Sequence, residues 1–117
     1  MRVIARSTLS KFVETLAGRK DKAAVKAALD AWFFEVRRAS WRTSQDVKRA
    51  YASAGVVDAE RVVFNIKGNS YRLVVAIHYE LQTVFVKWIG SHKEYDQIDV
   101  RTVEYGDQAY QKRSGSR

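Results

Sequence analysis

The segment GSHKEYDQID, residues 90–99, places a histidine, a lysine and a tyrosine directly after the mostly apolar run VFVKWI. A loop that only follows a strand requires none of these side chains, and the chain contains just two histidines. Imidazole and phenol groups can exchange protons in a reaction, and a lysine ammonium can stabilise developing negative charge. The segment is therefore either a solvated turn between a strand and a helix or part of a chemical site.

Three segments after residue 60 predict the strands that position this segment. They are RVVFNI, YRLVVAIHY and TVFVKWI, in which the side chains alternate with the period of two that β-strands show. The connections KGNS and ELQ have the length of hairpin loops, and Gly68 and Asn69 tolerate the positive φ angles of a tight turn. We therefore predict an antiparallel meander of three strands.

The first half of the chain predicts helices. Apolar residues at helical spacing form one stripe within residues 21–38, and a shorter helix is expected before Gly18. A third helix should begin at Thr43, which stands at capping-box spacing from Asp46, and should end at Gly55.

The whole pattern is that of an α+β domain. Its antiparallel sheet has three strands, or four if the N-terminal segment MRVIA joins it, and packs against the N-terminal helices. A length of 117 residues fits one domain. We expect that domain to span residues 1–105, with residues 106–117 as a flexible tail.

The hairpin register brings several polar residues together. If ELQ is the second turn, Arg72 lies near residues 89–91 at the end of the third strand, and antiparallel neighbours are only about 5 Å apart. The turn at residues 67–69, Arg72 and the segment 92–95 are therefore expected to meet at one end of the sheet. His78 lies further along the same strand, roughly 20 Å away at the strand rise, so the two histidines should not cooperate.

Several familiar chemistries lack their residue patterns in this site. The chain has no cysteine, which excludes disulfides, thiolate zinc sites and thiol nucleophiles. The site has no carboxylate pair, no Ser-His-Asp order and no glycine-rich phosphate loop. One histidine beside lysines would repel a cation, so we expect neither a metal nor a cofactor.

The same groups suit the cleavage of a phosphodiester. Cleaving RNA without a metal requires a base for the 2'-hydroxyl, an acid for the leaving 5'-oxygen and cations around the phosphorane. His92 and Tyr95 can exchange protons, while Lys67, Arg72 and Lys93 can neutralise charge. Each also has an ordinary interpretation: a surface histidine, solubilising lysines, an ion-paired arginine and a packing tyrosine.

Composition favours a polyanionic partner. The net charge is +8, from 21 basic and 13 acidic residues spread along the chain, which points to nucleic acid ahead of an anionic membrane surface. No stretch approaches the roughly 18 apolar residues of a membrane span, and MRVIARSTLS lacks the apolar core of a signal peptide. The absence of cysteine suits a reducing cytosol, so a cytoplasmic location is expected.

Two motifs carry a family resemblance. FNIKGNSYRL and GSHKEYD together resemble the HigB family of toxin–antitoxin toxins, within the RelE-like group, and the similarity extends over roughly residues 1–105. The resemblance implies a RelE-like fold and an endoribonuclease that cleaves mRNA during translation and arrests growth. It also implies a HigA-like helix-turn-helix antitoxin as partner, with operator DNA reached only through that antitoxin.

The resemblance carries over only to the residues that match the two motifs. Ser91 stands where the family often has threonine and keeps the hydroxyl group. We expect catalytic roles for His92, Tyr95, Arg72 and Lys67, and RNA-binding roles for Lys93, Asn65, Asn69 and Tyr71.

A second function class stays open. The same basic end of the sheet could dock RNA or the ribosome without cleaving anything, so that the protein blocks translation as a binding module. A DNA-binding module is the weaker third reading, because no predicted helix carries the polar base-reading residues of a recognition helix.

Overall fold

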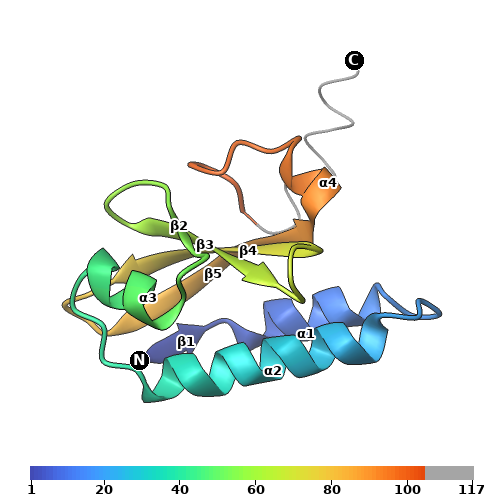
Figure 1. Cartoon of the computed structure of the whole chain (residues 1–117), viewed down its shortest axis with the longest axis horizontal. Coiled ribbons are helices and arrows are strands. Elements are labelled where there is room, and N and C mark those ends of the chain that lie inside the picture. The colour runs from blue at the N-terminus through green and yellow to red at the C-terminus, as the bar shows by residue number, and fades with distance from the viewer. Residues whose placement is uncertain (105–117) are drawn as a thin grey trace.

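Alternating residues in the second half of the chain form the centre of a β-sheet (Figure 1). In the computed structural model, which describes residues 1–104, the central strands are β3 (Arg61–Ile66), β4 (Tyr71–His78) and β5 (Thr83–Ser91). They pair antiparallel in sequence order, which confirms the predicted meander.

A β-bulge in the β4–β5 ladder keeps a charged side chain out of the core. Val74 pairs with Trp88, but the next residue, Val75, pairs with Val86, so Lys87 is the extra residue on β5. Without the bulge Lys87 would lie opposite Val75 and face the main core, because side chains alternate between the faces of a sheet. With it, Val86 packs against the core instead.

Two short outer strands complete the sheet: the N-terminal one was predicted as an optional fourth strand, and the other was not predicted. β1 (Arg2–Ile4) pairs parallel with β5, and β2 (Gly55–Val56) pairs antiparallel with β3, which gives five strands in the order β1-β5-β4-β3-β2. The prediction of a three- or four-stranded antiparallel sheet was therefore wrong: the sheet is mixed and five-stranded. A two-residue strand is too short to show alternation, and a strand's own periodicity does not encode the direction of its partner.

Three helices precede the central strands, as predicted. α1 (Arg6–Glu14) and α2 (Lys22–Arg38) lie together on one face of the sheet (Figure 1). α3 (Ser44–Ala50) begins with the predicted capping box, in which Thr43 and Asp46 satisfy each other's backbone amides. Its predicted end at Gly55 was wrong, because the chain leaves the helix at Ala50 and turns so that β2 can pair with β3.

The main core lies between the helices and the sheet. Trp32 of α2 meets Phe64 of β3 edge to face, with ring centroids 5.5 Å apart. Fully buried aliphatic side chains from both layers surround this pair, among them Val25, Val36, Leu73 and Val75. Buried residues of α2 recur every three or four positions, at Val25, Leu29, Trp32 and Val36, and Leu73 and Val75 are two apart on the strand, as an amphipathic helix on a half-buried sheet face requires.

A second, smaller core covers the opposite face of the sheet. Val63, Val74 and Trp88 pack there against Val103, from the segment that follows the short helix α4 (His92–Tyr95). The sequence pattern gave no sign of this packing after residue 98. The predicted tail, residues 106–117, lies outside the described residues, and the domain boundary at residue 105 stays a prediction.

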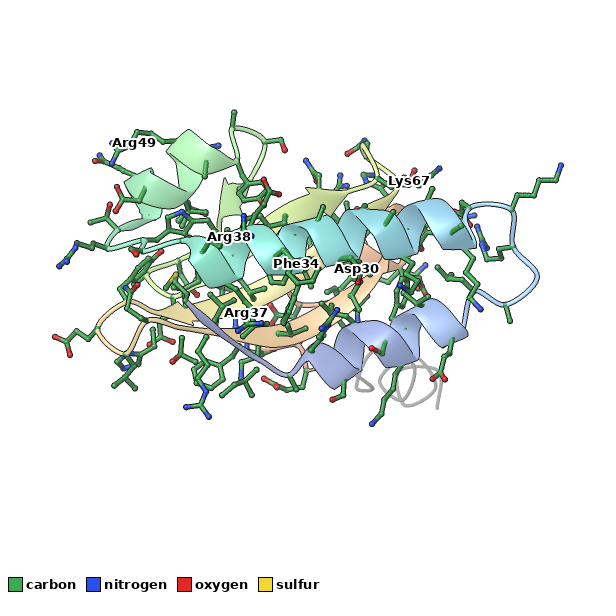
Figure 2. All side chains as sticks on the ribbon, turned by 90° about the horizontal axis from the view of Figure 1, so that it is seen from below. Asp30, Phe34, Arg37, Arg38, Arg49 and Lys67 are labelled. Atoms are coloured by element: carbon green, nitrogen blue, oxygen red, sulfur yellow. The ribbon has the colours of Figure 1, made fainter. Side chains whose placement is uncertain are left out.

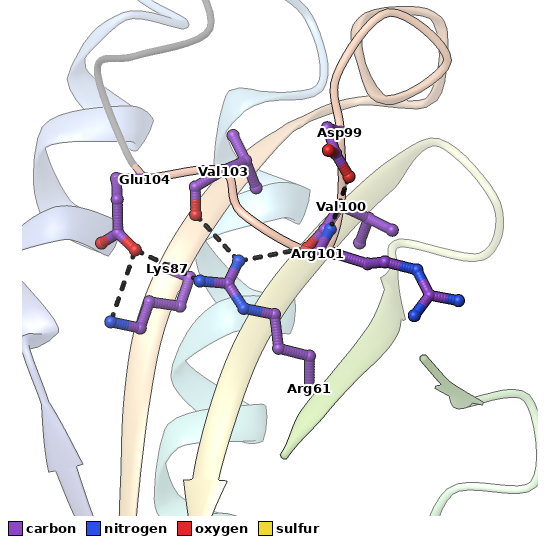
Figure 3. Close-up of polar contacts among 7 residues, drawn as sticks. All are labelled: Arg61, Lys87, Asp99, Val100, Arg101, Val103 and Glu104. Carbon is purple, nitrogen blue, oxygen red and sulfur yellow. Dashed lines mark hydrogen bonds and ion pairs between the residues drawn. The ribbon is translucent and has the colours of Figure 1, made fainter. Parts of the chain in front are cut away.

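One arginine fastens this last described segment to the sheet (Figure 3). Nη1 of Arg61 donates to the carbonyl oxygens of Val100 at 3.1 Å and Val103 at 2.9 Å. Its Nη2 lies 3.2 Å from a carboxylate oxygen of Glu104, which Lys87 also approaches at 3.5 Å. Only 11% of the Arg61 side chain is exposed, so these contacts are shielded more than a surface ion pair.

We expect Arg61→Ala to lower the free energy of unfolding by about 1–3 kcal/mol, because two carbonyls beside a buried surface lose their donor. Urea unfolding should show the loss, and hydrogen exchange of the Val103 amide should become faster. Arg101→Ala is the matched control, because the Arg101 side chain is exposed and its contact with Asp99 comes from its backbone nitrogen. Equal effects of the two substitutions would contradict the assigned role of Arg61.

Candidate functional site

The ends of the three central strands bring most of the predicted site residues to one end of the sheet. Arg72 of β4 lies opposite Asn65 on one side and opposite Gly90 on the other. The pairing with Gly90 agrees with the predicted register. The backbone nitrogen of His92 donates to the Ser70 carbonyl at 3.0 Å, so α4 begins directly beside the β3–β4 turn. α4 lies on the face of the sheet away from α1 and α2 (Figure 1).

Arg72 and Tyr95 contact each other at the centre of this end of the sheet. The guanidinium carbon of Arg72 lies 5.8 Å from the centroid of the Tyr95 ring, within the range of a cation–π contact. Nη1 of Arg72 also donates to the Asn69 carbonyl at 3.2 Å. These two contacts orient the guanidinium, and a guanidinium has five N–H donors in all, so others remain for an anion.

The turn between β3 and β4 places Lys67 in an unusual backbone conformation. Its φ is +53°, and Gly68 follows with φ +62°. A left-handed conformation costs a residue with a side chain on the order of 1 kcal/mol, which glycine avoids. Strain of this kind often marks functional sites, and the exposed Lys67 ammonium lies at the same end of the sheet as Arg72.

A second capping box fixes the start of α4. The Ser91 hydroxyl accepts from the Glu94 backbone nitrogen at 3.1 Å, and a Glu94 carboxylate oxygen accepts from the Ser91 nitrogen at 2.9 Å. Glu94 therefore has a structural task. The box also sets the directions in which His92, Lys93 and Tyr95 leave the helix.

His92 and Lys93 both face solvent at this end. Nε2 of His92 lies 3.8 Å from a carboxylate oxygen of Asp96 on the same helix, and 48% of the His92 side chain is exposed. Among the side-chain hydrogen bonds and ion pairs of residues 1–104, this is the one contact of His92. The structure thus brings His92 to the same end of the sheet as Arg72 and Tyr95, but the His92 side chain makes no hydrogen bond or ion pair with either of them.

Tyr71 is separated from the other predicted RNA-binding residues. It faces the helices, is 3% exposed and packs edge to face on Phe12 at 5.6 Å. Its hydroxyl donates to Asp21 at 2.6 Å; burial raises the pKa of the Tyr71 phenol, and the hydrogen bond lowers the pKa of the Asp21 carboxyl. The stabilisation from ionised Asp21 is present above its ordinary pKa and is lost as pH falls through the lowered value.

A shallow groove runs beside Arg72 and Tyr95. Its volume is about 380 Å³, and its walls include the edge strand β2 and the half-buried Asn65. Nδ2 of Asn65 donates to the Ser53 carbonyl at 3.3 Å, so one end of this amide is fixed and its oxygen remains available. The groove has an aromatic wall, a cation and amide groups, which suits a nucleotide.

A model of the HigB toxin family, the RelE-like toxic component of a toxin–antitoxin system, matches residues 25–98. The chain belongs to this family. The match runs from α2 through α4 and contains both sequence motifs. No curated protein matches the chain. Family membership makes the protein a toxin of a toxin–antitoxin system, with an antitoxin as its partner.

Two further observations on this HigB-family toxin concern metal ions and membranes. Within residues 1–104, no three histidine or carboxylate side chains gather as a bound metal ion would need. Over the same residues, none of the helices combines the length and the apolar character that crossing a bilayer requires.

Sequence reasoning missed the residues that support Tyr95 in this HigB-family toxin. The Tyr95 ring contacts both Arg72 and the fully buried Trp88, whose ring centroid is 6.3 Å away. A Cβ atom on Gly90 would lie 2.4 and 2.5 Å from Trp88 ring atoms. Residues two apart on a strand share a face, so the spacing of Trp88 and Gly90 was a usable signal. Ser53 and β2 also line the groove beside Arg72, but no sequence pattern indicated them.

We expect Gly90→Ala to lower the free energy of unfolding by about 1–3 kcal/mol, because the added methyl group forces the buried Trp88 ring to move. The shift should pass to Tyr95, so the variant should also lose toxicity. Urea unfolding and growth assays measure the two effects. Gly55→Ala is the control for the unfolding measurement alone, because a Cβ there meets no atom within 4 Å but Gly55 lines the groove beside Arg72. Unchanged stability in both variants would show that the Trp88–Gly90 contact is not a constraint.

Proposed function

We propose that this toxin is a metal-independent endoribonuclease that cleaves mRNA during translation. The observation that best supports the proposal is the Arg72–Tyr95 contact, in which a guanidinium lies beside a phenol, a group able to exchange a proton, next to an open groove. His92, Lys93 and Lys67 lie at the same end of the sheet as that pair. Family membership supports this class of activity.

The proposed reaction uses the RNA's own 2'-hydroxyl. The 2'-oxygen attacks the neighbouring phosphorus, the P–O5' bond breaks, and a cyclic 2',3'-phosphate and a 5'-hydroxyl form. One of His92 and Tyr95 accepts the 2' proton and the other donates a proton to the 5'-oxygen. Arg72 and Lys67 stabilise the extra negative charge on the phosphorane, where fixed cations contribute most.

The remaining predicted residues have binding roles in this proposal. Lys93 contacts a backbone phosphate, and the Asn65 amide contacts a base or sugar in the groove. Asn69 contributes through its carbonyl oxygen, which orients Arg72. The buried Tyr71 contributes by bracing β4 against Asp21 rather than by touching RNA.

The proposed partners follow from this activity and from the family. The ribosome presents mRNA to the toxin, so the protein acts where translation takes place in the cytoplasm. A HigA-like helix-turn-helix antitoxin neutralises it, and operator DNA is bound through that antitoxin alone. The net charge of +8 supports a nucleic-acid partner.

A specific observation favours one alternative, a non-catalytic RNA or ribosome binder. The one polar partner of His92 within the described residues is Asp96 on its own helix, not Arg72 or Tyr95. An exposed basic edge is sufficient for docking and needs no proton transfer. Mapping RNA 5' ends after induction separates the two: new ends within translated messages indicate cleavage, and stalled ribosomes on intact messages indicate binding.

We expect His92→Ala to abolish growth arrest and to slow mRNA cleavage at least about 100-fold, the lower end of general acid–base contributions. The fold should persist, because His92 is exposed and packs little. His78→Ala is the control: this exposed histidine lies on the far end of β4, opposite Thr83. If folded His92→Ala arrests growth as the parent does, His92 does not transfer a proton.

We expect cleavage of a minimal RNA substrate to continue in excess chelator and to leave a 5'-hydroxyl and a cyclic or 3'-phosphate end. A 2'-deoxy or 2'-methoxy sugar at the cleaved position should make the substrate inert, because the nucleophile is absent. End-group analysis by mass spectrometry measures both results, and a minimal substrate avoids the loss of ribosomes in chelator. A 5'-phosphate product, or activity restored by one divalent ion, would exclude this mechanism.

A further inference from the structure

A groove on the helix layer lies away from the candidate active site. It runs between α1 and α2 and has a volume of about 380 Å³. Leu9, Val13, Leu29 and Phe33 line it with apolar surface. Because α1 and α2 cover the sheet face opposite α4, an occupant of this groove would not enter the groove beside Arg72 (Figure 1).

Cations and exposed aromatic surface continue from one end of this groove along α2. The guanidinium carbon of Arg6 lies 4.2 Å from the Phe33 ring centroid and 5.7 Å from that of Phe34. Phe34 is 51% exposed, although aromatic residues are usually buried. Ala31 and Ala27, one and two turns before Phe34, are also exposed and small enough to let a second helix approach closely.

Two arginines beside Phe34 have no carboxylate partner within residues 1–104. Figure 2 looks onto the helix layer, with Phe34, Arg37 and Arg38 labelled along the second half of α2. Among the ion pairs of residues 1–104, none involves Arg37 or Arg38, whereas the nearby Asp30 already pairs with Arg6 and Lys26. This part of the surface therefore offers apolar contacts next to uncompensated positive charge.

These features select among possible occupants. A second copy of the toxin in a symmetric dimer would bring Arg37 and Arg38 against their own copies, in a chain of net charge +8. RNA would need a surface of one sign, but the rim of this apolar groove mixes the cations Arg6, Lys22 and Lys26 with the carboxylates of Glu14 and Asp30. An amphipathic helix with acidic residues at its flanks satisfies both the apolar groove and the two arginines.

We propose that the α1–α2 groove, extended by Phe34, Arg37 and Arg38, is the docking surface for an acidic amphipathic segment of the antitoxin. The inference rests on membership of a toxin–antitoxin family, and it does not depend on RNA cleavage. Phe34 supplies an apolar anchor at the edge of the groove, and Arg37 and Arg38 select for carboxylates on the partner.

The experiment uses the cognate antitoxin, identified as the protein that restores growth when it is co-expressed with the toxin. Calorimetry with the two purified proteins should show that Phe34→Asp/Arg37→Glu weakens binding at least about 30-fold, the effect of one strong interface residue. Circular dichroism should show an unchanged fold, because the Phe34 and Arg37 side chains are exposed. Expressed alone, the variant should keep the parent's effect on growth, and the antitoxin should no longer suppress it.

Two control variants sharpen the result. Phe34→Leu keeps the apolar anchor and should bind within a few-fold of the parent. Arg49→Glu makes the same charge reversal on α3, outside the groove, at a side chain that is 71% exposed, and should leave affinity unchanged. Antitoxin affinity within about threefold of the parent in the double variant would overturn the proposal. The proposal would also be overturned if the double variant kept its affinity for the antitoxin and instead lost ribosome binding or toxin self-association.

Discussion

Strand β4 is buried on both sides, and its alternate residues belong to different layers of the molecule. Leu73 and Val75 pack under the helices, while Val74 packs against Trp88 on the opposite face. Arg72 shares the Val74 side at the end of the strand, next to Gly90. A shift of one residue in register would turn Arg72 into the main core, where an unpaired guanidinium is costly. The same alternation that builds the core therefore keeps the arginine in the site.

The face that carries the site has only a thin cover. A few apolar side chains and the segment after α4 pack there, and Arg61 ties that segment to the sheet through two carbonyls. Tyr95 belongs to this cover, since its ring rests on Trp88 and meets Arg72. A thin cover leaves the end of the sheet open to a polymer such as RNA. It also means that the position of Tyr95 depends on contacts such as Gly90 and Arg61, which take no part in the proposed chemistry.

Local sequence patterns were sufficient to predict the elements that each follow a single pattern. The long apolar stripe of α2, the Thr43–Asp46 capping box and the three-strand meander were all predicted correctly. The convergence of Arg72 and the 92–95 segment followed from hairpin register. The N-terminal segment was predicted as an optional fourth strand and forms β1. Its parallel pairing with β5 and the whole of β2 could not be predicted in this way, because such short strands carry no period and owe their pairing to partners far along the chain.

The site was predicted less completely than the fold, for a physical reason. Sequence motifs show which residue types occur together, but burial decides which of them can reach a substrate. Tyr71 and Arg72 are neighbours in one motif, yet they point to opposite faces of the sheet. The Tyr71 hydroxyl donates its hydrogen bond to Asp21. The alternation of β4 already implied this separation, since it assigned Tyr71 to the face that contains Leu73 and Val75. Pattern matching and periodicity therefore have to be applied together at each position.

The two faces of the sheet suit two different tasks, the proposed cleavage of RNA and the binding of a protein partner. The proposed RNA cleavage needs an open, polar end of the sheet, and tight binding of a protein partner favours apolar surface with matched charge. The helix layer offers the second without altering the first, since α1 and α2 meet the sheet through residues such as Leu73 and not through Arg72. An antitoxin seated between α1 and α2 would leave the groove beside Tyr95 unfilled. Neutralisation from that position would have to come from its bulk, which keeps the toxin from fitting against a large assembly such as the ribosome.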